Sequence, residues 1–376
     1  MNLVNQIFYQ TKTYFTNTGD ALINHALISK LREYGVLHAN CSREVPETFL
    51  NELGVRPEER EVANGEVGFI KSVLNSAVQA KKCGDRVFVV SGLGDMYGGN
   101  LRLALRNLAT GLVFPVFRLF GVQLVRIGRS VGPMTKLMMM SEWVRGLFLS
   151  YNYVRDSKSL ARCRKMGIKK VALCPDMSWL YQANHEEKIN QTNTVMVNLR
   201  NAIFDDVEQE FVDATLSKCE EVLDQLNVLL SGEMQVCVAY QIQEDAEFSL
   251  MVAERFKNKY PVKYIDHQLS LKELDEAYGQ VDFHISNRMH SLLAGYKYGS
   301  LPIALIDAKR HTKIAATFED CGLTELIADI CKPGERINGL VEKRERWIHR
   351  LVQCEKERNC EINKVLDIIF SERKGK

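Results

Sequence analysis

Apolar and polar positions along this chain follow two periods, one typical of buried strands and one typical of amphipathic helices. In the first half, short apolar runs such as 86–90 and 122–127 are followed by segments with helical spacing. The same alternation restarts at 194–199, after a polar stretch. Strands that alternate with helices favour parallel sheets covered on both faces. The pattern therefore predicts an α/β protein with two such sheets.

The length of the chain agrees with two domains of ordinary size, because 376 residues exceed what one core usually needs. We expect a first domain over residues 1–183, a polar linker that acts as a hinge over 184–193, and a second domain over 194–335. The remaining residues, 336–376, are expected to form two amphipathic helices.

Composition excludes several classes of protein. A net charge of +2 and the lack of a separate basic tract argue against a dedicated nucleic-acid binder. Ten cysteines without C-x-x-C spacing argue against a disulfide scaffold or a zinc site and fit a reducing cytosol. The first residues lack the basic start and the long apolar core of a signal peptide, so we expect none.

The apolar helices of the first domain raise the question of a membrane. No apolar run reaches the ~18–20 residues that span a bilayer. Residues 101–120 predict an arginine-studded helix broken at Pro115, and residues 134–150 predict a second apolar helix with Trp143. Packing in the core is the favoured use of 111–149, and contact with a membrane surface is the alternative.

The stretch from Asp282 to Lys313 reads as one strand–helix–strand unit. An apolar strand ends near Ile285, a helix follows over about 289–298, and a second strand covers 301–306. In open α/β sheets, ligands bind beyond the carboxyl ends of the strands. The residues that follow the two strands of this unit are therefore candidates for a binding site.

Cationic side chains follow both strands of this unit. Arg288 and His290 come after the first strand, and Arg310, His311 and Lys313 come after the second. A helix N-terminus beside them also favours anions. The set predicts a site for a small, highly charged anion with phosphate or carboxylate groups. Alternatively, it is a solvated basic edge with a helix-capping histidine.

Other strand ends carry weaker candidates. Gly19 and Asp20 lie in a turn that leads into a helix, where Asp20 is either a helix cap or a residue that faces a cleft. The run 91–100, which includes Gly94 and Asp95, predicts a glycine loop that presents backbone N–H groups to an anion or forms a tight crossover turn. A second such loop, 128–133, contains Arg129.

Several of these pieces, taken in order, resemble the polysaccharide pyruvyl transferase family. The resemblance covers most of residues 14–323, although Arg129 stands where a glutamine is common in the family. The matching pieces are N-T-G-D-A-L-I (17–23), G-L-G-D (92–95), I-G-R-S-V-G-P (127–133), V-R-D-S-K-S (154–159), C-P-D (174–176), V-N-L-R (197–200), S-N-R-M-H (286–290) and the segment 301–323.

The resemblance implies a GT-B-like architecture, with two Rossmann-like domains facing across a cleft and C-terminal helices that cross back to the first domain. It implies transfer of pyruvate from phosphoenolpyruvate onto a sugar of a surface polysaccharide or its lipid-linked precursor, as a cyclic ketal with release of phosphate. Phosphoenolpyruvate is then a co-substrate, and no metal or other cofactor is needed. The expected location is the cytoplasm, with the inner face of the membrane as a further possibility.

Under this interpretation the second domain binds the donor and the first domain binds the acceptor. His290 and Arg288 are the expected catalytic residues, because a histidine can move protons near neutral pH and an arginine can stabilise a departing phosphate. The expected donor-binding residues are Arg200, Arg288, Lys313, Arg310, His311 and Ser286. The expected acceptor or cleft residues are Asp20, Gly19, Gly94, Asp95 and Arg129.

Two other classes stay open from the sequence. The first is a glycosyltransferase of similar fold that uses a nucleotide sugar, although Glu319 and Glu325 do not have the spacing of seven residues that many such enzymes show. The second is a protein that binds an anion without turnover.

Overall fold

A computed structural model describes most of the chain, in two compact units. Unit 1 comprises Met1–Phe15, Ile23–Leu180 and Arg358–Lys376, and unit 2 comprises Thr16–Leu22 and Tyr181–Glu357. The polar linker predicted at 184–193 lies mostly outside the described residues. Those residues are 4–11, 14–41, 45–61, 65–91, 93–183, 192–201, 209–337 and 339–371.

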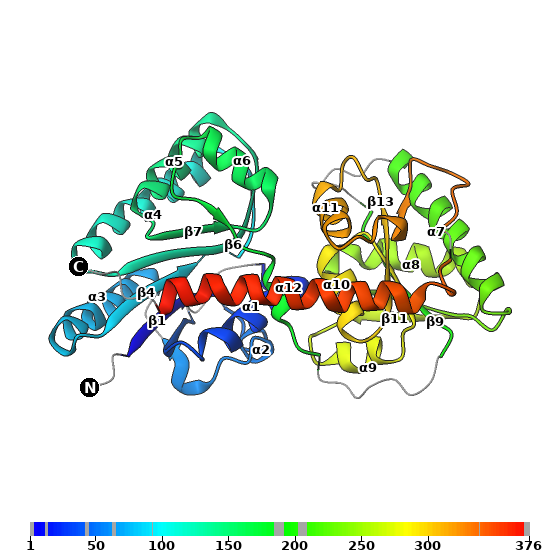
Figure 1. Ribbon diagram of the computed structural model, residues 1–376, viewed down its shortest axis with the longest axis horizontal. Helices are drawn as coiled ribbons and strands as arrows, with labels where there is room; N and C mark the ends of the chain where they lie inside the picture. Colours follow the sequence, from blue (N-terminus) through cyan, green and yellow to red (C-terminus); the bar gives the residue numbers. More distant parts are fainter. Residues whose placement is uncertain are drawn as a thin grey trace. The chain divides into compact units, whose positions relative to one another are not determined.

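Unit 1 contains an eight-stranded sheet in which all pairs of strands are parallel (Figure 1). Along the sheet, the strands are β3 (Arg60–Glu61), β2 (Val36–Asn40), β1 (Asn5–Gln10), β4 (Arg86–Ser91), β6 (Gln123–Met134), β7 (Tyr151–Val154) and β8 (Ala172–Leu173), and β5 (Gly94–Gly98) pairs with β6. The helices are α1 (Thr18–Leu31), α2 (Glu47–Glu52), α3 (Gly65–Cys83), α4 (Leu101–Leu119), α5 (Lys136–Phe148) and α6 (Ser157–Lys165). The first residues of α1 belong to unit 2.

Unit 2 contains a six-stranded parallel sheet with the strand order of a dinucleotide-binding Rossmann domain. The order is β11 (Val262–Gln268), β10 (Gln235–Tyr240), β9 (Thr194–Asn198), β12 (Phe283–Ser286), β13 (Leu301–Ile306) and β14 (Ile327–Asp329). The helices are α7 (Gln209–Leu229), α8 (Ala246–Phe256), α9 (Glu273–Gly279), α10 (Met289–Lys297), α11 (Thr312–Asp320) and the start of α12 (Arg344–Phe370). The predicted class, an α/β protein with two parallel sheets, is confirmed.

The apolar runs in the sequence form strands whose side chains are buried on both faces of the sheet. Every residue of β13 is buried, and β12 is buried over its whole length, as expected for central strands of a sheet covered on both faces. In unit 1, Phe8 of β1 and Val87 and Val89 of β4 pack against Phe69 and Val73 of α3. Each sheet therefore rests on its own apolar core.

Three local predictions differ from the structure. The helix expected to break at Pro115 continues as α4, because Phe117 and its apolar neighbours pack on the core and offset the one hydrogen bond that a proline forfeits. The loops expected at 91–100 and 128–133 are largely strand, since β5 pairs with an extended β6. The tail forms a single helix, α12, rather than two.

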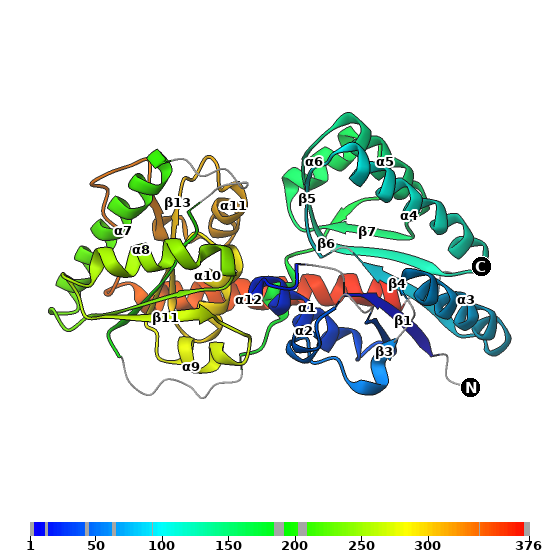
Figure 2. The same ribbon diagram turned by 180° about the vertical axis from the view of Figure 1, so that it is seen from behind.

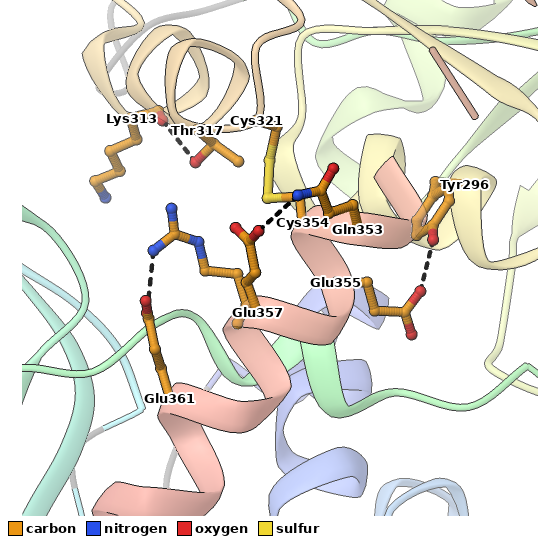
Figure 3. The surroundings of a disulfide bond; sticks show 10 residues. Tyr296, Lys313, Thr317, Cys321, Gln353, Cys354, Glu355, Glu357 and Glu361 are labelled. Carbon is orange, nitrogen blue, oxygen red and sulfur yellow. Dashed lines mark hydrogen bonds and ion pairs between the residues drawn. A yellow bond between two sulfur atoms is a disulfide. The ribbon is translucent and has the colours of Figure 1, made fainter. Parts of the chain in front are cut away.

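A disulfide joins two helices within unit 2. Cys321, at the end of α11, is bonded to Cys354 in α12, with the two Cα atoms 5.6 Å apart (Figure 3). Next to Cys354 in α12, Glu355 accepts a hydrogen bond of 2.6 Å from the Tyr296 hydroxyl and pairs with Lys297. The other eight cysteines are free, and the sequence analysis gave no sign of this pair.

Candidate functional site

The best candidate site lies at the carboxyl edge of the unit 2 sheet. The strand order reverses between β9 and β12, which are direct neighbours in register Asn198 to Ser286. At such a reversal, the loops that leave the two strands diverge and open a crevice where ligands bind. The loop after β9 carries Arg200, the loop after β12 carries Arg288, and His290 follows in the first turn of α10.

Hydrogen bonds fix the two loops to each other. The Asn287 side chain accepts from the backbone N–H of Arg200 and donates to its carbonyl, both at 2.9 Å. Ser286 donates its hydroxyl to the Asn198 carbonyl at 2.5 Å and accepts from the backbone N–H of Arg288 at 3.0 Å. Ser286 was predicted to bind the donor, and here its hydroxyl holds the turn that positions Arg288.

Arg288 pairs with a carboxylate that the sequence analysis did not single out. Its guanidinium forms an ion pair with Asp245, which follows β10 and is only 3 % exposed. Burial raises the pKa of the Asp245 carboxyl, and the charges of Arg288 and Arg200 oppose that rise. Asp245 therefore holds Arg288 in place from a third strand end. The signal was present in Glu244 and Asp245, which stand just after an apolar strand.

His290 is the second residue of α10, and a glycine packs on it. An ideal Cβ built on Gly19 would lie 3.0 Å from both Cβ and Nδ1 of His290, closer than side chains normally approach. The backbone N–H of Thr18 donates to the Gln241 carbonyl at 3.1 Å, and the Thr18 hydroxyl donates to the Leu269 carbonyl. The turn that contains Gly19 is therefore anchored within unit 2 and fits against the His290 ring.

Asp20 stands in the first turn of α1, beside this glycine. Its backbone N–H lies 3.4 Å from the Asn17 side-chain oxygen, which also accepts from Gly19 at 2.9 Å. Asn17 is thus the residue that caps α1. The alternative in which Asp20 is the helix cap is therefore wrong.

His311 behaves differently from the cation that the sequence suggested. Burial lowers the pKa of its imidazole to about 4, with the nearby Arg200 adding to the shift. The ring stacks near Phe211, with centroids 5.9 Å apart, and one ring nitrogen lies 3.2 Å from the Asp307 carbonyl. His311 is therefore neutral near pH 7 and can offer hydrogen bonds rather than charge.

The remaining predicted donor residues lie on the same loop and helix. Arg310 is exposed, and its backbone N–H donates to the Asp307 side chain at 3.0 Å. Lys313 is the second residue of α11 and half-buried. Both follow β13, the neighbour of β12, so the structure keeps them on the same edge of the sheet.

The carboxyl edge of the unit 1 sheet has the opposite character. Arg155, just after β7, forms ion pairs with Asp95 of β5 and, at 2.7 Å, with Asp176 after β8. Burial alone would lower the pKa of Arg155, but Asp95 and Asp176 raise it above its usual range. Asp156 accepts hydrogen bonds from Ser130 and Ser159. Three carboxylates thus surround one arginine, and of the three the sequence analysis named Asp95 as an acceptor or cleft residue.

Two further residues predicted for this edge lie within strands. Gly94 begins β5 with φ of +94°, a backbone conformation that favours glycine. Arg129 lies in β6, and burial together with Arg126 lowers its pKa to about 9. Arg126 itself is buried and pairs with Glu142 of α5 at 2.7 Å. The loop residues that we expected here are therefore parts of the sheet and its ionic interior.

Comparison with known proteins decides the family. The profile of the polysaccharide pyruvyl transferase family matches residues 17–299, well over half of the chain. This chain belongs to the polysaccharide pyruvyl transferase family. The matched span includes the turn at Gly19, the unit 1 edge and the segment from Arg200 to His290. The resemblance seen in the motifs is confirmed, and membership indicates a transferase.

Solved structures support the fold of this family member. A UDP-N-acetylglucosamine 2-epimerase aligns over 100 % of this chain and 98 % of its own, at 12 % identity and a TM-score of 0.56. A glycosyltransferase from Rickettsia africae aligns over 98 % of both chains at 13 % identity and a TM-score of 0.52. The epimerase of Neisseria meningitidis, solved with UDP-GlcNAc, aligns over 93 % of this chain and 94 % of its own at 9 % identity and a TM-score of 0.53. The predicted GT-B-like fold is confirmed. None of the curated proteins compared matches this sequence.

Proposed function

We propose that this polysaccharide pyruvyl transferase moves pyruvate from phosphoenolpyruvate onto a sugar of a surface polysaccharide or its precursor. The observation that supports this most is the cationic edge of unit 2, where Arg200, Arg288 and His290 meet at the reversal of strand order. Phosphoenolpyruvate is a small anion with one phosphate and one carboxylate. It suits a site with two arginine forks, because each fork can bind one of those groups through two hydrogen bonds.

The proposed chemistry begins at the enol carbon–carbon double bond of phosphoenolpyruvate. A proton delivered to the methylene carbon converts it to a methyl group and leaves an oxocarbenium-like centre at the next carbon. A sugar hydroxyl attacks that carbon, the bond from carbon to phosphate oxygen then breaks, and a second hydroxyl closes the ketal. The sugar hydroxyls release two protons in total. One equals the proton added to the methylene carbon, and the other equals the proton carried by the released phosphate.

His290 is assigned the proton transfers and Arg288 the departing phosphate. A histidine beside a helix N-terminus can donate and accept protons near neutral pH. Arg288, held by Asp245, presents a fixed charge where negative charge accumulates on the phosphate. Arg310 and Lys313 add charge on the same edge. No step of the scheme needs a metal or a redox cofactor.

The acceptor is assigned to unit 1. Its edge presents carboxylates, from Asp95, Asp156 and Asp176, which accept hydrogen bonds from hydroxyl groups such as those of a sugar. This edge is less suited to a trianionic donor, because its three carboxylates would repel the phosphate and the carboxylate of that donor. The two edges thus divide donor and acceptor by charge.

Mass detection of products tests this function directly. The purified chain is incubated with phosphoenolpyruvate and a panel of saccharides, including lipid-linked ones, and in parallel with nucleotide sugars. Pyruvate addition with release of one phosphate per product is the expected result. Transfer of a sugar from a nucleotide would replace the proposal with a glycosyltransferase, and phosphoenolpyruvate binding without any product would indicate a non-catalytic anion binder.

A further inference from the structure

One face of α4 is apolar although it is exposed to solvent. Leu101, Leu105, Leu112, Val116 and Leu119 are all exposed, with Leu119 at 79 % and Leu112 at 64 %. Their separations of four, seven, four and three residues place them on the same side of a helix. The buried residues of α4, among them Asn107, Gly111 and Phe117, lie on its other sides. The exposed leucines are therefore a second apolar face, beyond the one that packs on the core.

The neighbouring helix α5 also has exposed apolar side chains. Leu137, Met140, Trp143 and Leu147 are also exposed. The two helices pack together, and Asn107 of α4 donates to the Ser141 hydroxyl at 2.9 Å and to Glu142 at 2.7 Å (Figures 1 and 2). Of the twenty large apolar side chains exposed in the described part of the chain, nine lie on these two helices. That concentration separates this face from the scattered exposed apolar residues of an ordinary surface.

The exposed charges of α4 and α5 are all positive. Arg102, Arg106 and Arg118 of α4 and Lys136 of α5 are exposed. The one carboxylate on the two helices is Glu142, which is buried and paired with Arg126. An exposed face of large apolar side chains bordered by cations, with no exposed carboxylate, has the composition of a helix surface that lies in a membrane interface.

We infer that the α4–α5 face docks on a membrane surface that contains anionic lipids. The leucines and Trp143 enter the boundary between headgroups and acyl chains, and the arginines and Lys136 meet lipid phosphates. A second copy of the chain fits this face less well, because a symmetric contact would bring its unbalanced cations together. None of the described helices has the length and apolar character that a bilayer crossing demands, so the contact is with the surface. It does not depend on the proposed pyruvyl transfer.

Flotation with lipid vesicles tests the docking surface. The full chain is mixed with vesicles of phosphatidylcholine alone and with vesicles of phosphatidylcholine and phosphatidylglycerol. We expect co-flotation with the anionic vesicles that weakens as salt rises. The double variant L105Q/L112Q should bind at least about tenfold more weakly, because exposed leucines that enter the interface are lost. The variant R102Q/R106Q should lose about fivefold for each cation removed at low salt.

A matched control comes from unit 2. Leu250 and Met251 of α8 are about as exposed as Leu105, so L250Q/M251Q removes two apolar side chains from another surface. It should float like the unchanged chain, and all variants should keep the same thermal midpoint. Equal loss in this control, or absence of flotation by the unchanged chain, would overturn the inference. So would a dimer that L105Q/L112Q converts to a monomer with no change in vesicle binding, since the occupant would then be a second copy.

Discussion

The carboxyl edges of the two sheets share a topology and differ in charge. Both sheets place a first strand at the centre, flanked on one side by the second and third strands and on the other by the fourth. The unit 2 edge gathers arginines and a lysine with two buried carboxylates, Asp245 and Asp307. The unit 1 edge gathers three aspartates around one arginine, Arg155.

This difference shows that the fold determines where a ligand can bind, whereas the side chains at that edge determine which kind of ligand binds. A Rossmann-like edge presents loops and helix N-termini wherever it occurs, and both edges have these. The arginines and the lysine of the unit 2 edge suit an anion with several negative charges better than the three carboxylates of the unit 1 edge do. The proposed division into a donor edge and an acceptor edge depends on that contrast.

Removal of the His290 imidazole should give the largest effect on the unit 2 edge. H290A should retain its thermal midpoint and bind phosphoenolpyruvate within about tenfold of the unchanged chain. Turnover should fall by about 10²–10⁴, the usual range for loss of general acid–base help. Steady-state rates with a saturating saccharide measure this, and H267A, which removes an exposed histidine from the same unit, serves as control. Normal turnover or global unfolding of H290A would make this histidine a structural residue.

Acid should destabilise unit 2 through its buried histidines. Burial lowers the pKa of His284 to about 3 and that of His311 to about 4, from an ordinary value of 6.5. As pH falls below 6.5, these two histidines become protonated in the unfolded chain but stay neutral in the folded chain. The free energy of unfolding should therefore fall by about 1.4 kcal/mol per pH unit for each histidine, down to the folded pKa.

Urea unfolding at a series of pH values measures this slope. H311Q should flatten it by about half, whereas H267Q should leave it unchanged. If stability stayed level between pH 6.5 and pH 4, these two histidines would not be neutral in the folded chain.

A methyl group on Gly19 should disturb the unit 2 edge without touching a charge. G19A would press its Cβ against the His290 ring and move the imidazole by a fraction of an ångström. Turnover should fall by about 10–100-fold, with a smaller change in phosphoenolpyruvate affinity, because misplacement of a reacting group costs rate. G279A is the control, since a Cβ there meets nothing within 4 Å. Equal turnover in the two variants would remove Gly19 from any role in positioning His290.

The sequence located residues at this edge where they directly follow an apolar strand. Ser286, Arg288 and His290 follow one apolar strand, and Arg200 follows another, so strand ends alone located them. The sequence analysis did not identify Asp245, because its partner Arg288 lies far along the chain. The two residues come together only because β9 pairs with both β10 and β12. His311 was counted as a cation because a sequence does not reveal burial. The strands β5 and late β6 were taken for loops because their glycines suggest turns.

The same conservative change on each edge tests the central claim most directly. R200K and R155K both keep a positive charge and both remove a planar fork. Titration calorimetry with phosphoenolpyruvate should show affinity weakened by about tenfold in R200K, since charged hydrogen bonds are lost, and unchanged within error in R155K. Weaker binding in R155K with normal binding in R200K would place the donor on the unit 1 edge and contradict the account.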